Sequence, residues 1–179
     1  SIKKVSYYTV TSDFVNSILD TYDGLRVTGA SLGGGLAIIT GAQTGAPSIA
    51  ISGLGAEYAR HSLNPPVSLE DINERVFNWI PDRDYIARLG GRPRQHQEAQ
   101  CNATTSDLFG CHSMWRSVCE INYRCGTNGR PVICRCVYNF DFPAPLPIGN
   151  TTRSFDQACY EQEQAYLKAT GSNLTSAWS

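Results

Sequence analysis

Apolar residues recur along the first hundred positions in short blocks, each about as long as one helix or strand. Residues 11–22 carry apolar side chains at helical spacing, and the small, apolar residues 36–42 predict a buried helix. Residues 25–28, 48–52 and 75–80 are short apolar runs, which predict strands. The order strand, helix, strand, helical connector, strand is typical of a parallel α/β sheet.

This regular pattern weakens in the second half of the chain. Residues 115–122 predict a short helix, and residues 156–170, rich in strong helix formers, predict the clearest helix of all. We therefore expect two domains. Residues 1–100 hold the sheet core, and residues 101–179 form a mostly irregular and helical region that ends in the clear helix.

Composition and charge exclude several classes of protein. A chain of 179 residues with 41% hydrophobic and 17% charged residues can form a packed core, so it is not a disordered tail. Its formal net charge of -1 argues against binding to nucleic acid or anionic lipid. Apolar runs such as residues 36–39 are too short for a transmembrane segment. The start at Ser1 rather than Met leads us to expect a processed product.

The second half of the chain carries all of the cysteines and three N-glycosylation sequons. The sequons begin at Asn102, Asn150 and Asn173. Sequons beside a dense cysteine cluster predict disulfide bonds and a secreted or lumenal protein. The seven candidates for disulfide bonds are Cys101, Cys111, Cys119, Cys125, Cys134, Cys136 and Cys159.

The alternative reading of these cysteines is a zinc site. Only one residue separates Cys134 from Cys136, and no Cys-x-x-Cys pair occurs, although His112 next to Cys111 could supply a ligand. We therefore expect disulfides and no metal. Because seven is odd, one thiol is expected to be free or paired with another chain.

A glycine-rich turn carries the candidate chemistry. The segment Gly29-Ala-Ser-Leu-Gly33 matches the G-x-S-x-G motif and lies between a predicted strand and a predicted helix. In that context a sharp turn exposes the hydroxyl of Ser31, and side chains at the flanking glycines would clash. The N–H of Leu32 and the helix N-terminus can then stabilise an oxyanion. A structural turn with an incidental serine remains open, whereas a phosphate-binding loop lacks its Lys-Ser/Thr.

Five segments between about residues 25 and 136 belong together with this motif. They are Val27-Thr-Gly-Ala-Ser-Leu-Gly-Gly-Gly-Leu-Ala37, Ile49-Ala-Ile-Ser-Gly53, Phe77-Asn-Trp-Ile-Pro-Asp-Arg-Asp-Tyr-Ile-Ala-Arg-Leu89, Gln97-Glu-Ala-Gln-Cys101 and Gly110-Cys-His-Ser-Met-Trp-Arg-Ser-Val-Cys119. In this order the segments resemble the class 3 lipases, the fungal-type triacylglycerol lipase family with an α/β-hydrolase fold. The resemblance implies that Ser31 is the nucleophile, Asp84 the orienting acid and His112 the general base.

The residues themselves agree with this order of serine, aspartate and histidine, which is that of α/β-hydrolases. Asp84 follows a predicted strand at its carboxyl end, where open parallel sheets place functional groups. Asp82 is an alternative acid, and His96 is the competing histidine. His61 follows a helical stretch and is expected at the surface.

The sequence departs from the family in three places. Ala30 precedes the serine where the family carries a bulkier residue, and Ile86-Ala87 replaces a Val-Pro. Only thirty residues precede Ser31, whereas the family has a long segment there with strands, a lid and a second oxyanion donor. We therefore expect the C-terminal half of an α/β-hydrolase sheet with flanking helices, followed by a disulfide-rich tail. A second chain, which the unpaired cysteine could link, would supply the remainder of the fold.

Three functions are compatible with the sequence. The first is a secreted serine ester hydrolase that acts on an ester or lipid substrate without a cofactor. The second is a non-catalytic lipase-like component of an extracellular glycoprotein complex. The third is a disulfide-rich binding module, which only residues 101–159 support.

Overall fold

The computed structural model describes residues 6–101, 103, 109–125, 133–143 and 154–171. The chain divides into two compact units, Ser1–Ser117 and Val118–Ser179, which we describe separately. The three sequon asparagines and the side chain of Cys125 lie outside the described residues.

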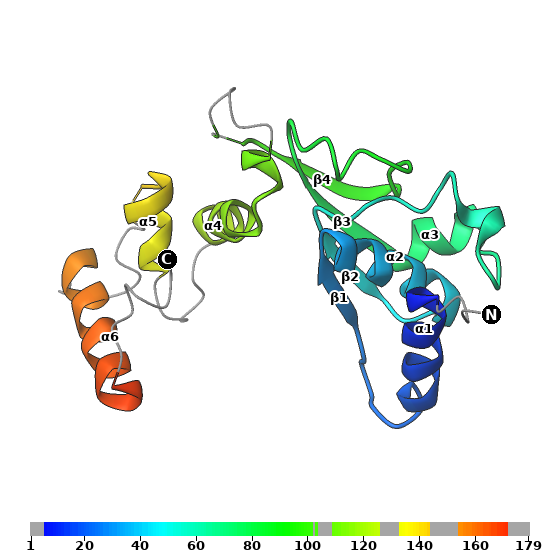
Figure 1. The fold of residues 1–179 in the computed structure, drawn as a ribbon, viewed down its shortest axis with the longest axis horizontal. Helices are drawn as coiled ribbons and strands as arrows, with labels where there is room; N and C mark the ends of the chain where they lie inside the picture. Colours follow the sequence, from blue (N-terminus) through cyan, green and yellow to red (C-terminus); the bar gives the residue numbers. More distant parts are fainter. Residues whose placement is uncertain (1–5, 102, 104–108, 126–132, 144–153, 172–179) are drawn as a thin grey trace, which may run out of the picture. The chain divides into compact units, whose positions relative to one another are not determined.

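A four-stranded parallel sheet forms the centre of the first unit (Figure 1). Its strands are β1 (Val27–Ala30), β2 (Ser48–Ile51), β3 (Val76–Pro81) and β4 (Gln95–Ala99), and they lie in chain order. All three strand pairs are parallel, so the carboxyl ends of the strands meet at one edge. The predicted parallel α/β sheet is confirmed.

The first unit also contains helices α1 (Tyr7–Ile18), α2 (Leu32–Thr44) and α3 (Leu69–Arg75), and α2 packs against the first three strands (Figure 1). The core joins one face of the sheet to α2 and α3, because apolar side chains from these elements bury one another. Its buried members include Ile38 and Ala42 of α2, Ala50 of β2, Ile72 of α3 and Val76 of β3.

Two elements of this unit differ from expectation. Helix α1 begins at Tyr7 and ends at Ile18 instead of covering residues 11–22, and Phe14, an apolar residue of the predicted helix, is exposed. Strand β4 was not expected, because its sequence Gln95-His-Gln-Glu-Ala99 is polar and only Ala99 is buried.

The second unit contains most of α4 (Met114–Cys125), together with α5 (Cys134–Phe140) and α6 (Phe155–Thr170). The predicted final helix is confirmed: the Ser154 hydroxyl accepts a hydrogen bond from the N–H of Gln157, and Gly171 ends α6 with φ of 68°. Helix α5 was not expected from the sequence. It is only 7 residues long, and the disulfide bonds of Cys134 and Cys136 hold its first turn.

Six of the seven cysteines form three disulfide bonds, so the prediction of disulfides is confirmed. The pairs are Cys101–Cys111, Cys119–Cys136 and Cys134–Cys159. The described residues contain no group of three or more side chains that could bind a metal ion. Within the same part of the chain, no helix combines the length and the apolar character needed to cross a membrane.

Candidate active site

Ser31 lies in the turn that joins β1 to α2, directly after the last residue of the strand. Its backbone adopts φ of 53° and ψ of -122°, a conformation that costs a residue with a side chain about 1–3 kcal/mol. Its N–H donates a hydrogen bond of 3.0 Å to the carbonyl oxygen of Ile51 in β2, which fixes the turn to the sheet. This strained turn is the geometry expected of a nucleophile elbow.

The glycines around Ser31 have different roles. A Cβ atom at Gly29 would lie 2.2 Å from the carbonyl oxygen of Gly33, and one at Gly34 would lie 2.7 Å from the Cα atom of Gly53. A Cβ atom at Gly33 would meet no atom within 4 Å. The expected clash at both glycines of the motif is therefore correct for Gly29 and wrong for Gly33.

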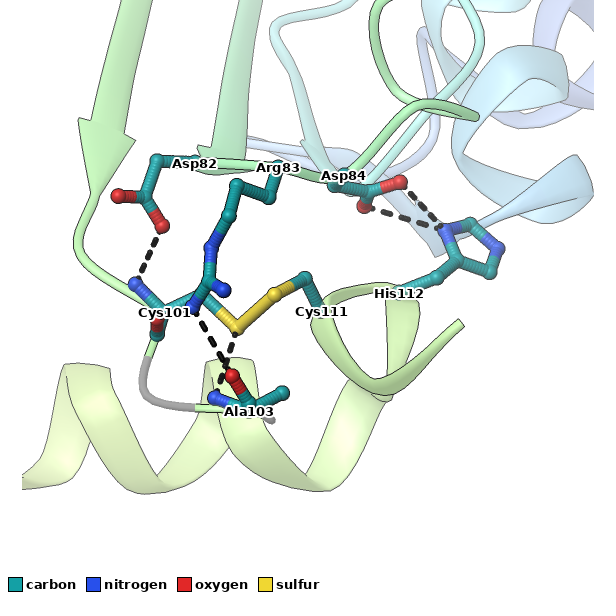
Figure 2. The surroundings of a disulfide bond; sticks show 7 residues. All are labelled: Asp82, Arg83, Asp84, Cys101, Ala103, Cys111 and His112. Atoms are coloured by element: carbon teal, nitrogen blue, oxygen red, sulfur yellow. Dashed lines mark hydrogen bonds and ion pairs between the residues drawn. A yellow bond between two sulfur atoms is a disulfide. The ribbon is translucent and has the colours of Figure 1, made fainter. Parts of the chain in front are cut away.

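The structure brings Ser31, His112 and Asp84 together. The Oγ atom of Ser31 is 2.7 Å from Nε2 of His112. The Nδ1 atom of His112 is 3.0 Å and 3.1 Å from the two carboxyl oxygens of Asp84, as Figure 2 shows. Because an ionised carboxylate can only accept hydrogen bonds, Nδ1 carries the proton and Nε2 accepts from the serine hydroxyl.

Asp84 is held firmly, since its side chain is completely buried. Its Oδ1 atom accepts hydrogen bonds from the backbone N–H groups of Ile86 and Ala87, each at 3.1 Å. These donors compensate the carboxylate for the water that it has lost and fix its orientation toward the imidazole.

The alternative residues have other partners. Asp82 accepts a hydrogen bond of 2.5 Å from the N–H of Cys101, and the ring of His96 bonds the carbonyl oxygen of Pro93 at 2.8 Å. His61 lies at the surface in a 3-10 helix, η1 (Arg60–Ser62). Asp84 and His112 are thus the acid and the histidine that the structure places next to Ser31.

Leu32 is the first residue of α2, so its N–H is among the first-turn donors that a helix leaves without an intrahelical acceptor. These donors lie at the positive end of the helix dipole, and Ser31 is the N-cap residue of this helix. The N–H of Leu32 is therefore suitably placed to bind an oxyanion formed at Ser31.

Sequence reasoning missed one residue that supports this turn. Asn78 is fully buried in the middle of β3, where its side chain binds both backbone groups of Gly53. Because Gly34 packs against Gly53, Asn78 indirectly supports the first turn of α2. An asparagine inside the apolar run Val76-Phe-Asn-Trp-Ile80 is the signal that could have revealed it.

No protein-family model matches the chain, and no curated protein is similar to it at a significant level. The role of the site therefore depends on its own geometry.

Proposed function

We propose that the protein is a secreted serine ester hydrolase of the class 3 lipase type, with Ser31 as nucleophile, His112 as general base and Asp84 as orienting acid. One observation carries the proposal. Ser31 has the strained backbone of an elbow, and its Oγ atom lies 2.7 Å from an imidazole whose other nitrogen faces a buried carboxylate. A structural turn has no need of this combination of strain and polar contacts.

In the first half of the reaction, the Oγ atom of Ser31 attacks the carbonyl carbon of an ester and gives its proton to Nε2 of His112. Asp84 stabilises the imidazolium that forms, and the N–H of Leu32 donates to the oxyanion of the tetrahedral intermediate. The ester C–O bond then breaks, the alcohol leaves with the proton from Nε2, and Ser31 carries the acyl group.

In the second half, water attacks the acyl carbon and His112 takes its proton. The tetrahedral intermediate collapses, the carboxylic acid leaves, and the Oγ atom of Ser31 recovers its proton from Nε2. The net reaction consumes one ester and one water and yields one acid and one alcohol, without a cofactor.

Two further features support the class and the compartment. The three residues follow the chain order serine, aspartate, histidine, and Ser31 and Asp84 follow the carboxyl ends of parallel strands β1 and β3. Three disulfide bonds are typical of proteins from oxidising compartments, in accordance with secretion.

A fluorophosphonate probe with adduct mapping tests the proposal. We expect a label on Ser31 of the wild-type protein and none on Ser31→Ala. The matched control is Ser52→Ala, because Ser52 also follows a strand with φ of 53°, yet its buried hydroxyl has no partner among the described residues. Ser52→Ala should retain the label. A folded wild-type protein without a label at Ser31 would contradict the proposal and favour the non-catalytic role.

A further inference from the structure

The turn after β3 carries three consecutive charged residues, Asp82, Arg83 and Asp84. Their side chains contact two different segments of the chain (Figure 2). Asp84 faces His112, whereas Asp82 and Arg83 face the chain near Cys101. Arg83 has φ of 61°, a left-handed conformation that a residue with a long side chain rarely adopts. Such strain persists only where surrounding contacts hold it, so the contacts of Arg83 are informative.

Arg83 binds the backbone of the segment that follows β4. Its Nη2 atom donates to the carbonyl oxygen of Cys101 and, at 3.0 Å, to that of Ala103. Asp82 adds a hydrogen bond of 2.5 Å from the N–H of Cys101. Hydrogen bonds with a charged partner are the strong ones, and both Cys101 and Ala103 are buried.

A covalent link continues from this segment to the candidate active site. Cys101 forms a disulfide with Cys111, the residue directly before His112, and Cys101, Ala103 and Cys111 form one small buried cluster. The 3-10 helix η2 (Gly110–His112) that carries the histidine has no side-chain cap of its own. The disulfide therefore ties this short helix to Cys101 and to the residues that hold Cys101.

We propose that Arg83 is a positioning residue for His112, acting through Cys101 and the Cys101–Cys111 disulfide. The guanidinium touches neither Ser31 nor His112. It fixes one end of the disulfide to the turn that carries Asp84, so that the imidazole and its carboxylate are held from the same turn. The predicted effect on reaction rate depends on the proposed function of Ser31, whereas the effect on the orientation of His112 does not.

The first test measures His112 directly and needs no activity. In protein labelled with ¹⁵N-histidine, the proton on Nδ1 of His112 should give a low-field resonance that exchanges slowly with water, assigned by its loss in His112→Gln. In Arg83→Met this proton should exchange about tenfold faster or more, the factor expected for losing a hydrogen bond to a charged group. The control Arg88→Met, which removes a half-exposed arginine of the same loop, should exchange as the wild type does.

The second test asks whether the disulfide transmits the effect. The double variant Cys101→Ala, Cys111→Ala should accelerate exchange by a similar factor, and adding Arg83→Met should change little more, because the two links act in series. If Arg83→Met does not fold, Arg83→Lys replaces it, since one ammonium grips the two carbonyl groups less well and should give an intermediate rate.

The third test measures how fast Ser31 reacts with the fluorophosphonate. The labelling rate should fall about 10- to 100-fold in Arg83→Met and recover partly in Arg83→Lys, because a misplaced general base lowers the reaction rate by such a factor. Wild-type exchange of the His112 proton in folded Arg83→Met, or no such resonance in the wild-type protein, overturns the inference. If exchange of the His112 proton depends on Arg83 but Ser31 never reacts with the fluorophosphonate, the two proposals separate. Arg83 then positions His112, and the proposed hydrolase function is wrong.

Discussion

Asn78 binds Gly53 through both of that residue's backbone groups. The Oδ1 atom of Asn78 accepts from the Gly53 N–H at 3.2 Å, and its Nδ2 atom donates to the Gly53 carbonyl oxygen at 2.9 Å. This pair of bonds locks the turn after β2 to the neighbouring strand β3. The first turn of α2 packs on the same glycine, so the buried side chain of Asn78 indirectly supports the backbone that follows Ser31.

Asn78→Ala is expected to lower the free energy of unfolding by about 1–3 kcal/mol, because it leaves the buried N–H and carbonyl groups of Gly53 without partners. Urea unfolding followed by circular dichroism measures the change. Asn16→Ala on the exposed surface of α1 is the control and should remain within about 0.5 kcal/mol of the wild type. Equal stability of the two variants would show that Asn78 does not support the turn.

The two glycines of the G-x-S-x-G motif should respond oppositely to alanine. Gly29→Ala should destabilise the protein by about 3 kcal/mol or more, because its methyl group would overlap the carbonyl oxygen of Gly33. Gly33→Ala, inside α2 and facing open space, should be neutral or stabilising by up to about 1 kcal/mol. Thermal unfolding of both variants compares them, and a large loss for Gly33→Ala would contradict the steric account.

Among the histidines, His112 should control the reactivity of Ser31. His112→Gln should slow labelling by a fluorophosphonate about 100-fold or more, because the serine loses its general base. His96→Gln should label at the wild-type rate, since the ring of His96 bonds the carbonyl oxygen of Pro93 instead. The labelling rate of each variant, measured by mass spectrometry, gives the comparison, and the reverse order of effects would identify His96 as the base.

In the second unit, the hydrogen bond to Asp156 raises the pKa of Tyr138 above its ordinary value of 10.0, with burial and the carboxylate charge adding to the effect. Asp156→Ala should lower this pKa, whereas Glu163→Ala in the same helix should leave it unchanged. Ultraviolet titration of each protein against its Tyr138→Phe counterpart isolates the phenol.

The direction of the Tyr138 shift also fixes its effect on stability. Because the folded protein holds the phenol proton more tightly than the unfolded chain, this bond stabilises the fold fully below pH 10.0 and loses its effect as the pH rises through the raised pKa. An unfolding free energy whose pH dependence is identical in wild type and Asp156→Ala would refute the coupling.

Much of the candidate site could be predicted because its residues lie in recognisable local sequence motifs. The glycine-rich turn marked Ser31, and the order of residues in the resembling segments marked Asp84 and His112. No sequence motif indicates a role for Arg83. Its role depends on a left-handed backbone and on which cysteine pairs with Cys101, and the spacing of seven cysteines does not determine their pairing.

The fold was predictable where burial imposes an apolar pattern or where strong helix formers follow one another, as in α6. Strands β2 and β3 are apolar and each pairs with a strand on both sides, whereas β4 lies at the edge of the sheet and has a polar sequence. Helix α5 is too short, at 7 residues, to show a helical period, and Cys134 and Cys136 hold it covalently. The helix was predicted to begin at residue 11 because Thr11, Ser12 and Asp13 are residue types that N-caps favour, but all three lie inside α1.

The pairing of Cys134 and Cys136 has one more consequence. These two residues share α5, yet Cys136 is bonded to Cys119 on its N-terminal side and Cys134 to Cys159 on its C-terminal side, so the two loops overlap. Any single peptide bond between positions 119 and 159 can therefore be hydrolysed by a protease without separating the two fragments. On gel electrophoresis a nicked molecule would run as a single species without a reductant and as two fragments with one.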